Sequence, residues 1–127
     1  MVQKITLEGL PPSKKNSKQI FINRKTGKRF MTSSSNYKAW ETETVLMFKT
    51  MLKKIKGSVA MQVMFNTKSK YKKDLSNSFE GIADVLVLAG IIEDDNWYVL
   101  RSVNLWRKES DHDYTEIYIY DNEVEEV

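Results

Sequence analysis

Five acidic residues in the second half of the chain have an order and spacing that suit metal-dependent chemistry. Glu80 and Asp84 fall on one face of a predicted helix, because residues four apart in a helix lie about 40° from each other. Asp74 precedes this helix, and Asp94 and Asp95 follow it, so a short antiparallel return of the chain would bring the pair toward the acidic face. Clustered carboxylates are hard oxygen ligands for Mg²⁺ or Mn²⁺. Such ions stabilise the attacking and leaving oxygens when a phosphodiester is hydrolysed in line.

The same acidic residues have a simpler structural interpretation. Asp74 suits the N-cap of the helix, where its side chain would accept a hydrogen bond from a backbone N–H. Glu80 and Asp84 suit a solvated helix face, and Asp94 and Asp95 suit a turn. The residue types and their spacing, taken without further information, favour this structural interpretation over metal ligation.

The charge is divided sharply between the two halves of the chain. Residues 1–73 contain 17 lysines and arginines and three acidic residues, whereas residues 74–127 contain three basic and 14 acidic residues. Basic segments favour polyanion binding, because each neutralised phosphate releases counterions. An acidic pocket alone would repel DNA, so we interpret the basic half as a surface for DNA phosphates, with solvated loop charge as the alternative. The predicted DNA-binding residues are Lys14, Lys15, Lys18, Arg24, Lys25, Lys28, Arg29, Lys70, Lys72 and Lys73.

Hydrophobic periodicity and turn signals indicate a small α+β fold. We predict strands at residues 2–10, 19–23, 28–31, 59–65, 99–106 and 115–120, with a basic hairpin turn at 24–27. A helix of about twenty residues is predicted between the hydroxyl-rich run 32–35 and Gly57, with residues 37, 40, 44, 47, 51 and 55 on its apolar face. A second helix is predicted at 74–89, ended by Gly90, with residues 75, 79, 82, 86 and 89 facing the core. This order predicts one α+β domain with a mixed sheet and two main helices, followed by a frayed acidic tail at 121–127.

The composition excludes several other kinds of site. The chain has no cysteine, which excludes a disulfide framework and a thiolate zinc site. Its only histidine, His112, lies in the polar stretch 109–113, so a Ser-His-Asp mechanism is not expected. No segment approaches the ~20 apolar residues of a membrane-spanning helix, and we expect a cytoplasmic protein with no membrane partner.

The acidic segment resembles the signature of the RusA family of Holliday-junction resolvases. That signature runs Asp-x-Asp-Asn, then a helix with an inner aspartate, a glycine and an Asp-Asp pair. The corresponding residues here are Asp74-Leu75-Ser76-Asn77, Asp84, Gly90 and Asp94-Asp95. The strand that runs into Pro11-Pro12-Ser13, followed by Asn16, is similar to the opening of the family, so the resemblance spans most of the chain.

The resemblance implies a RusA-like fold and a Mg²⁺-dependent endonuclease, with Mn²⁺ as an alternative ion. The substrate implied is a four-way DNA junction in recombination and repair. A homodimer is implied as well, because a junction with two-fold symmetry must be nicked at two opposed strands and each subunit of this size has one carboxylate cluster.

Carried over to this chain, the family pattern assigns Asp74 and Asp95 to catalysis and metal binding, with Asp94 as a further ligand. Asp84 joins the catalytic set, and Asn16 and Asn77 join the DNA-binding set.

Two positions depart from the family pattern. Ser76 stands in place of the second catalytic aspartate, and Glu80 stands in place of the usual catalytic lysine. The Ser and Glu variants resemble phage-borne members of the family, so we expect Glu80 to supply the missing carboxylate, both for catalysis and for the metal. The positive charge of the family lysine would then come from Lys73 or Lys72.

Two other functions remain compatible with the sequence. If Ser76 has broken the site, the protein is a catalytically weak or inactive binder of branched DNA. Alternatively, it is a protein-interaction module whose basic and acidic halves pair between subunits. Divalent-metal binding and DNA cleavage distinguish the endonuclease from both.

Overall fold

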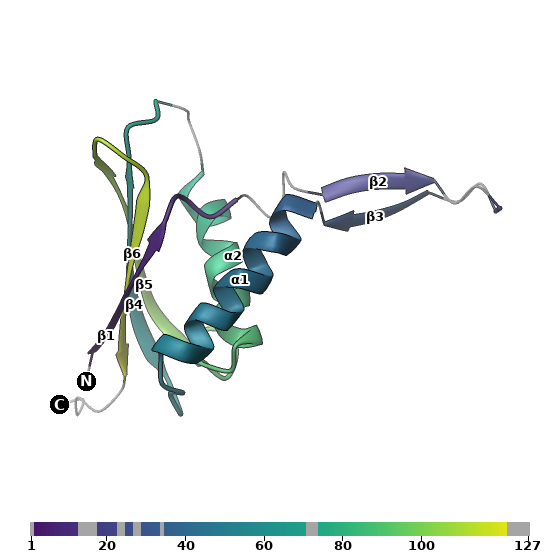
Figure 1. Ribbon diagram of the computed structural model, residues 1–127. Coiled ribbons are helices and arrows are strands. Elements are labelled where there is room, and N and C mark those ends of the chain that lie inside the picture. The colour runs from purple at the N-terminus through teal and green to yellow at the C-terminus, as the bar shows by residue number, and fades with distance from the viewer. Residues whose placement is uncertain are drawn as a thin grey trace.

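The computed structural model describes residues 2–12, 18–22, 25–26, 29–33, 35–70 and 74–121. It confirms the predicted α+β architecture: two helices lie against one face of a four-stranded mixed sheet, and a two-stranded sheet extends away from them (Figure 1). Within these residues, no helix has the length and apolar character needed to cross a membrane.

The secondary-structure elements follow the predicted order. They are β1 (Val2–Glu8), β2 (Lys18–Ile22), β3 (Arg29–Ser33), α1 (Ser35–Met51), β4 (Val59–Thr67), α2 (Leu75–Leu88), β5 (Leu100–Glu109) and β6 (Tyr114–Asp121). The largest difference from prediction is the end of the first helix, because α1 stops at Met51. Of the predicted acidic tail, Asp121 belongs to β6 and the rest lies outside the described residues.

Contacts with distant segments explain why α1 ends before Gly57. The backbone of Lys53 donates to the Gln3 side chain at 2.8 Å and accepts from it at 3.0 Å. The Ile55 N–H donates to the Ile91 carbonyl oxygen at 2.7 Å. Backbone groups that a longer helix would use internally are therefore bonded to β1 and to the segment after α2.

The apolar face of α1 also differs from prediction in its second half. Tyr37 is buried as predicted, but Met51 is 64% exposed and Met47 lies at the surface. Phe48 and Leu52 are buried instead. Because successive side chains of a helix point about 100° apart, a displacement of one residue changes which side chain reaches the core.

The sheet has the strand order β1-β6-β4-β5. β4 and β5 are parallel and are joined by α2, whereas β6 is antiparallel to both β1 and β4. β5 and β6 are consecutive in the chain, but β4 lies between them in the sheet. Because β4 and β5 are parallel, the chain between them must return to the starting end of the sheet, and it does so through α2 and residues 90–99, here called the return segment.

The core lies between the sheet and the two helices. β4 shows the predicted alternation, because Val59, Met61, Val63 and Phe65 are buried and the residues between them are only partly buried. Buried side chains from the other elements complete the core, among them Ile5, Phe48, Ile82, Leu86, Ile117 and Ile119. In α2, Leu75 is an exception to the predicted apolar face, since it lies at the surface of the first turn.

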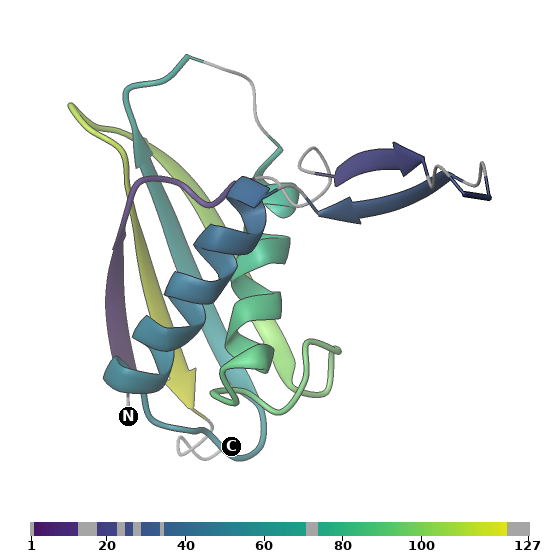
Figure 2. The ribbon, with the colours of Figure 1, turned by 45° about the vertical axis from the view of Figure 1, so that its right-hand side comes forward.

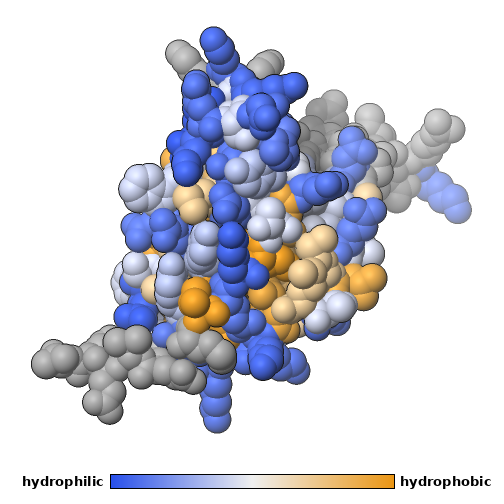
Figure 3. All heavy atoms as spheres, turned by 60° about the vertical axis from the view of Figure 1, so that its left-hand side comes forward, coloured by the Kyte–Doolittle hydropathy of each residue, from blue (hydrophilic) through white to orange (hydrophobic). Residues whose placement is uncertain are grey.

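In the described part of the chain, the sheet face opposite the helices is uncovered. Strand register places Thr6, Glu116, Met64 and Trp106 in one row across this face. Trp106 is 53% exposed. Figure 3 is turned toward this side and shows hydrophilic and pale residues over much of the view, with a hydrophobic area at its centre and lower right. We call this surface the open face.

Candidate functional site

The return segment brings the second aspartate of the Asp94-Asp95 pair to the acidic side of α2. In Figure 2, the segment between α2 and β5 turns back alongside the helix. Asp95, Glu80 and Asp84 line one surface depression of about 340 Å³, whose remaining lining is Phe79, Ala83 and Leu100. The short antiparallel return expected from the sequence is therefore present, and it joins Asp95 to the two acids of α2.

A second depression of about 290 Å³ adjoins the first and shares Asp84 and Asp95 with it. Its wall includes Glu41, which belongs to α1. The sequence analysis missed Glu41, although this residue directly follows Trp40, which was predicted to face the core and packs against it partly buried. Three separate segments thus contribute acids to this surface: α1, α2 and the return segment.

Hydrogen bonds within the return segment separate the roles of the two neighbouring aspartates. Asp94 accepts from the Asp95 backbone N–H at 2.7 Å and from the Asn96 side-chain amide at 2.9 Å. The bonds from Asp95 and then the bond from Asn96 lower the pKa of Asp94. Asp94 therefore forms the turn, as the structural interpretation of the sequence allows, and Asp95 lines the depressions.

Asp74 lies at the other end of α2 from these acids. It is the N-cap residue, and its carboxylate accepts from the Ser76 backbone N–H at 2.9 Å and from the Ser76 hydroxyl at 2.7 Å. Ten residues separate Asp74 from Asp84, which corresponds to about 15 Å along the helix axis. The structure thus brings together Glu80, Asp84 and Asp95, and it does not place Asp74 or Asp94 among the residues that line this surface.

Because Asp74 caps α2, its replacement by alanine should lower the free energy of unfolding by about 1 kcal/mol. Asp74→Asn should leave stability nearly unchanged, since asparagine is an equally good N-cap residue. Urea unfolding of both variants measures the difference. Equal stability of the alanine variant and the wild type would contradict the capping role.

Asp74→Asn also removes the carboxylate charge without removing the cap. A loss of DNA cleavage in this stable variant would support the metal role that the family pattern assigns to Asp74.

The crossing of α1 over α2 holds the acidic residues near each other. At Gly81, an added Cβ would lie 3.2 Å from the Tyr37 hydroxyl and 3.3 Å from the Trp40 ring, so the glycine permits a close approach of the two helices. Burial raises the pKa of Tyr37 to about 12, with further contributions from the negative charges of Asp84, Glu41 and Glu80. Tyr37 therefore lies within electrostatic reach of acids from both helices.

This pKa predicts a loss of stability at high pH. Tyr37 should titrate near pH 10 when unfolded and at about 12 when folded, so its contribution to stability is complete below pH 10 and decreases as pH rises toward 12. Urea unfolding at pH 8, 10 and 11 should show a steeper loss for the wild type than for Tyr37→Phe. Parallel losses in the two proteins would contradict the assignment.

The donor chemistry of Glu80, Asp84 and Asp95 fits a hard divalent cation. Mg²⁺ commonly takes one or two carboxylates and keeps several water ligands, and an open depression leaves room for those waters and for a phosphate. Across residues 2–12, 18–22, 25–26, 29–33, 35–70 and 74–121, no group of three or more acidic or histidine side chains is close enough to hold one ion. A metal here would therefore rest on fewer protein ligands than the predicted set of Asp74, Glu80, Asp94 and Asp95.

The predicted basic residues are only partly described. Lys25 and Lys70 are exposed, Lys18 and Arg29 belong to the paired strands β2 and β3, and Asn77 is half-buried on α2. The other predicted DNA-binding residues lie outside the described residues, namely Lys14, Lys15, Asn16, Arg24, Lys28, Lys72 and Lys73. The catalytic prediction for Lys73 falls there too.

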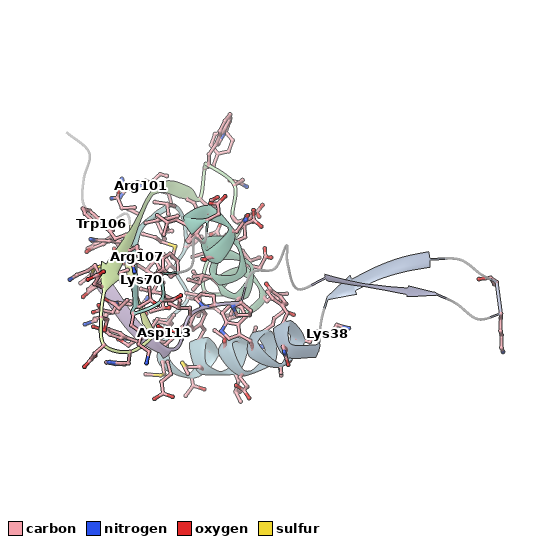
Figure 4. All side chains as sticks on the ribbon, turned by 90° about the horizontal axis from the view of Figure 1, so that it is seen from above. Lys38, Lys70, Arg101, Trp106, Arg107 and Asp113 are labelled. Atoms are coloured by element: carbon pink, nitrogen blue, oxygen red, sulfur yellow. The ribbon has the colours of Figure 1, made fainter. Side chains whose placement is uncertain are left out.

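One further basic residue was missed by the sequence analysis. Arg107 of β5 donates a hydrogen bond to the Ser69 carbonyl oxygen at 2.8 Å. Figure 4 shows Arg107 and Lys70 on the same side of the molecule, and Lys38 near the β2–β3 arm. A basic residue within the acidic half of the sequence thus reaches the loop that follows β4, which only the parallel β4–β5 pairing brings about.

No protein-family model matches this chain, and no curated protein is significantly similar to it in sequence.

Proposed function

We propose that this protein is a Mg²⁺-dependent endonuclease that cuts four-way DNA junctions by phosphodiester hydrolysis. The observation that carries the proposal is the meeting of Asp95 with Glu80 and Asp84 in one open depression. Three hard oxygen donors from two segments suit a cation and a phosphate better than an organic substrate. The resemblance of the acidic segment to RusA resolvases supplies the junction as substrate.

In this proposal, two of the three carboxylates of Glu80, Asp84 and Asp95 would hold the ion, which would stabilise negative charge on the oxygens of the scissile phosphate. Asp84 and Asp95 line both depressions, so these two carboxylates are the proposed principal ligands. The rest of the lining is the apolar side chains of Phe79, Ala83 and Leu100, which offer no competing ligand for the ion. Asp94 positions Asp95 through the hydrogen bond to its backbone N–H.

The acidic depression would repel DNA unless basic residues elsewhere on the protein offset its charge. Lys25 on the β2–β3 arm and Lys70 after β4 are exposed and suit contact with the phosphate backbone. Junction binding should therefore weaken steeply as salt concentration rises. Replacing both lysines with glutamine should flatten this salt dependence, whereas Lys49→Gln on α1 is the matched control.

We also propose that the protein acts as a homodimer and that the open face is the interface. Strands about 4.8 Å apart and rows about 6.8 Å apart give four strands and four rows a flat outline of roughly 500 Å² per copy. Two copies would bury about 1,000 Å² in total, without the additional surface of projecting side chains. This area is near the lower end of the range for a specific interface. Glu8 and Lys108 lie on this face at opposite edges of the sheet, so two copies can pair them reciprocally.

The test combines solution mass with activity on defined substrates. A dimer has twice the 14.8 kDa mass of the chain. In Mg²⁺ it should nick a mobile junction in symmetric pairs and leave linear duplex and single strands intact. Trp106→Glu should yield monomers, whereas Leu46→Glu on the exposed side of α1 should not. A wild-type monomer, or a dimer unaffected by Trp106→Glu, would contradict the interface.

A specific observation favours a second candidate, a branched-DNA binder with little or no activity. Ser76 occupies the place of the family's second aspartate, and its hydroxyl donates to Asp74. A side chain committed to the helix cap supplies no carboxylate to a metal. Tight junction binding without cleavage in Mg²⁺ and in Mn²⁺ would support this function over the endonuclease.

A further inference from the structure

We propose that Trp97 and Tyr98, here called the aromatic pair, stack on nucleobases that are exposed at the branch point of a DNA junction. This inference rests on the proposed function, because it places the aromatic pair beside the phosphate that the carboxylates would bind. Neither residue belongs to the acidic set or to the basic residues discussed above.

The aromatic pair is far more exposed than aromatic side chains usually are. Trp97 and Tyr98 are each 80% exposed, whereas Trp106 on the open face is 53% exposed. Their ring centroids are 6.2 Å apart and the rings are nearly perpendicular, at 78°. Two adjacent large aromatic groups held in water indicate a binding surface, because burying either ring on a partner is favourable.

The backbone that carries the aromatic pair is held in place by local hydrogen bonds. The Asn96 side-chain oxygen accepts from the Tyr98 N–H at 3.0 Å and from the Val99 N–H at 3.3 Å. The Asn96 amide in turn donates to Asp94 at 2.9 Å. Val99 is buried directly after the pair and anchors the segment to the core. The rings are therefore presented outward by an ordered turn, which lowers the entropic cost of binding a ligand.

The position of the aromatic pair next to Asp95 identifies the ligand. Trp97 follows Asp95 by two residues, so their Cα atoms are at most about 7.6 Å apart. Asp95 lines the depression that is proposed to take the scissile phosphate. A group that reaches the aromatic pair while a phosphodiester occupies the depression belongs to the same or a neighbouring nucleotide. The group in a nucleotide that stacks on aromatic rings is the base.

Branched DNA offers bases for stacking that a continuous duplex does not. Inside a duplex both faces of each base pair are covered by neighbouring pairs, whereas unpaired or terminal bases at a branch expose a face. Stacking of one base on an aromatic side chain strengthens binding by about fivefold to 150-fold. The aromatic pair would therefore contribute selectivity for the branch, while the lysines contribute affinity for any DNA.

The experiment measures DNA binding without cleavage, in buffer free of divalent ions. Junctions carry 2-aminopurine either at the branch point or in the middle of one arm, and a linear duplex of the same arm sequence is the reference. The double variant Trp97→Ala/Tyr98→Ala should bind the junction at least about tenfold more weakly and bind the duplex unchanged. The change in 2-aminopurine fluorescence at the branch should disappear, and the mid-arm signal should stay the same.

Two control variants separate stacking from other effects. Trp97→Phe/Tyr98→Phe retains two aromatic rings and should therefore retain junction selectivity. If it does, the loss in the alanine double variant comes from the missing rings. Leu46→Ala removes another exposed apolar side chain, on α1, and should leave junction binding unchanged.

Several outcomes would overturn the inference. Unchanged junction selectivity in the alanine double variant would do so, as would an equal loss of duplex and junction affinity. A change of solution mass in that variant would instead assign the aromatic pair to contact with a second copy of the chain. Failure of the proposed carboxylate site is distinguishable from failure of this inference. It appears as cleavage that survives Asp95→Asn, and this result does not change the binding measurements made without divalent ions.

Discussion

Asp95→Asn is expected to reduce junction cleavage in Mg²⁺ by more than about 100-fold while leaving folding and junction binding largely intact. Replacing even an outer partner of a metal ligand commonly costs 10- to 100-fold, and Asp95 is proposed to contact the ion itself. Binding can tighten, because the substitution removes one negative charge that faces the phosphates. Single-turnover cleavage with enzyme in excess measures the chemical step apart from binding.

The matched control for this variant is Asp111→Asn. Asp111 is exposed in the turn between β5 and β6 and contacts His112 at 2.6 Å, away from the acids of α2. This substitution should leave the cleavage rate unchanged. A near wild-type rate for Asp95→Asn, with the control also active, would end the assignment of the carboxylate site.

Glu80→Ala is expected to cause the second large effect, a loss of cleavage far beyond its effect on stability. An exposed helix substitution usually changes the free energy of unfolding by under ~0.5 kcal/mol, so most of the damage should be catalytic. The physical reason is that Glu80 and Asp84 lie one helical turn apart in the same depression, where each carboxylate adds to the charge that holds a cation. Cleavage rates and urea unfolding on the same samples separate the two effects.

Two variants sharpen this test of Glu80. Glu43→Ala removes an exposed glutamate from α1 and should preserve cleavage. Ser76→Asp in the Glu80→Ala background restores a carboxylate at the position where the family pattern has one, and partial recovery of cleavage is expected. Unchanged turnover in Glu80→Ala, with folding verified, would return Glu80 to the role of a solvated helix acid.

Local patterns in the sequence were sufficient to place most elements and the ends of α2. Asp74 caps this helix, as the structural interpretation of the sequence has it, and Gly90 follows the helix with a φ of +73°, as predicted. These features depend on neighbouring residues only, because a cap needs a backbone N–H two or three positions away and a left-handed turn needs a glycine. The alternation of β4 is likewise local, since successive side chains of a strand point to opposite faces.

Contacts between distant segments decided the features that were predicted wrongly or missed. α1 ends at Met51 because backbone groups after it bond to Gln3 and Ile91, which are remote in sequence. The inward turn of Phe48 in place of Met47 depends on where the helix lies on the sheet, and periodicity resolves this only to about one residue.

In the candidate site too, local spacing accounts for some features and contacts between distant segments account for others. The sequence by itself determined that Glu80 and Asp84 share one face of α2, because helical geometry fixes that spacing. Only the tertiary structure decided that Asp95 meets these two acids, because the connection from α2 to the parallel strand β5 turns the return segment back beside the helix. The arrival of Glu41 required the close crossing of α1 over α2 at Gly81, a contact between helices that no spacing along one segment encodes.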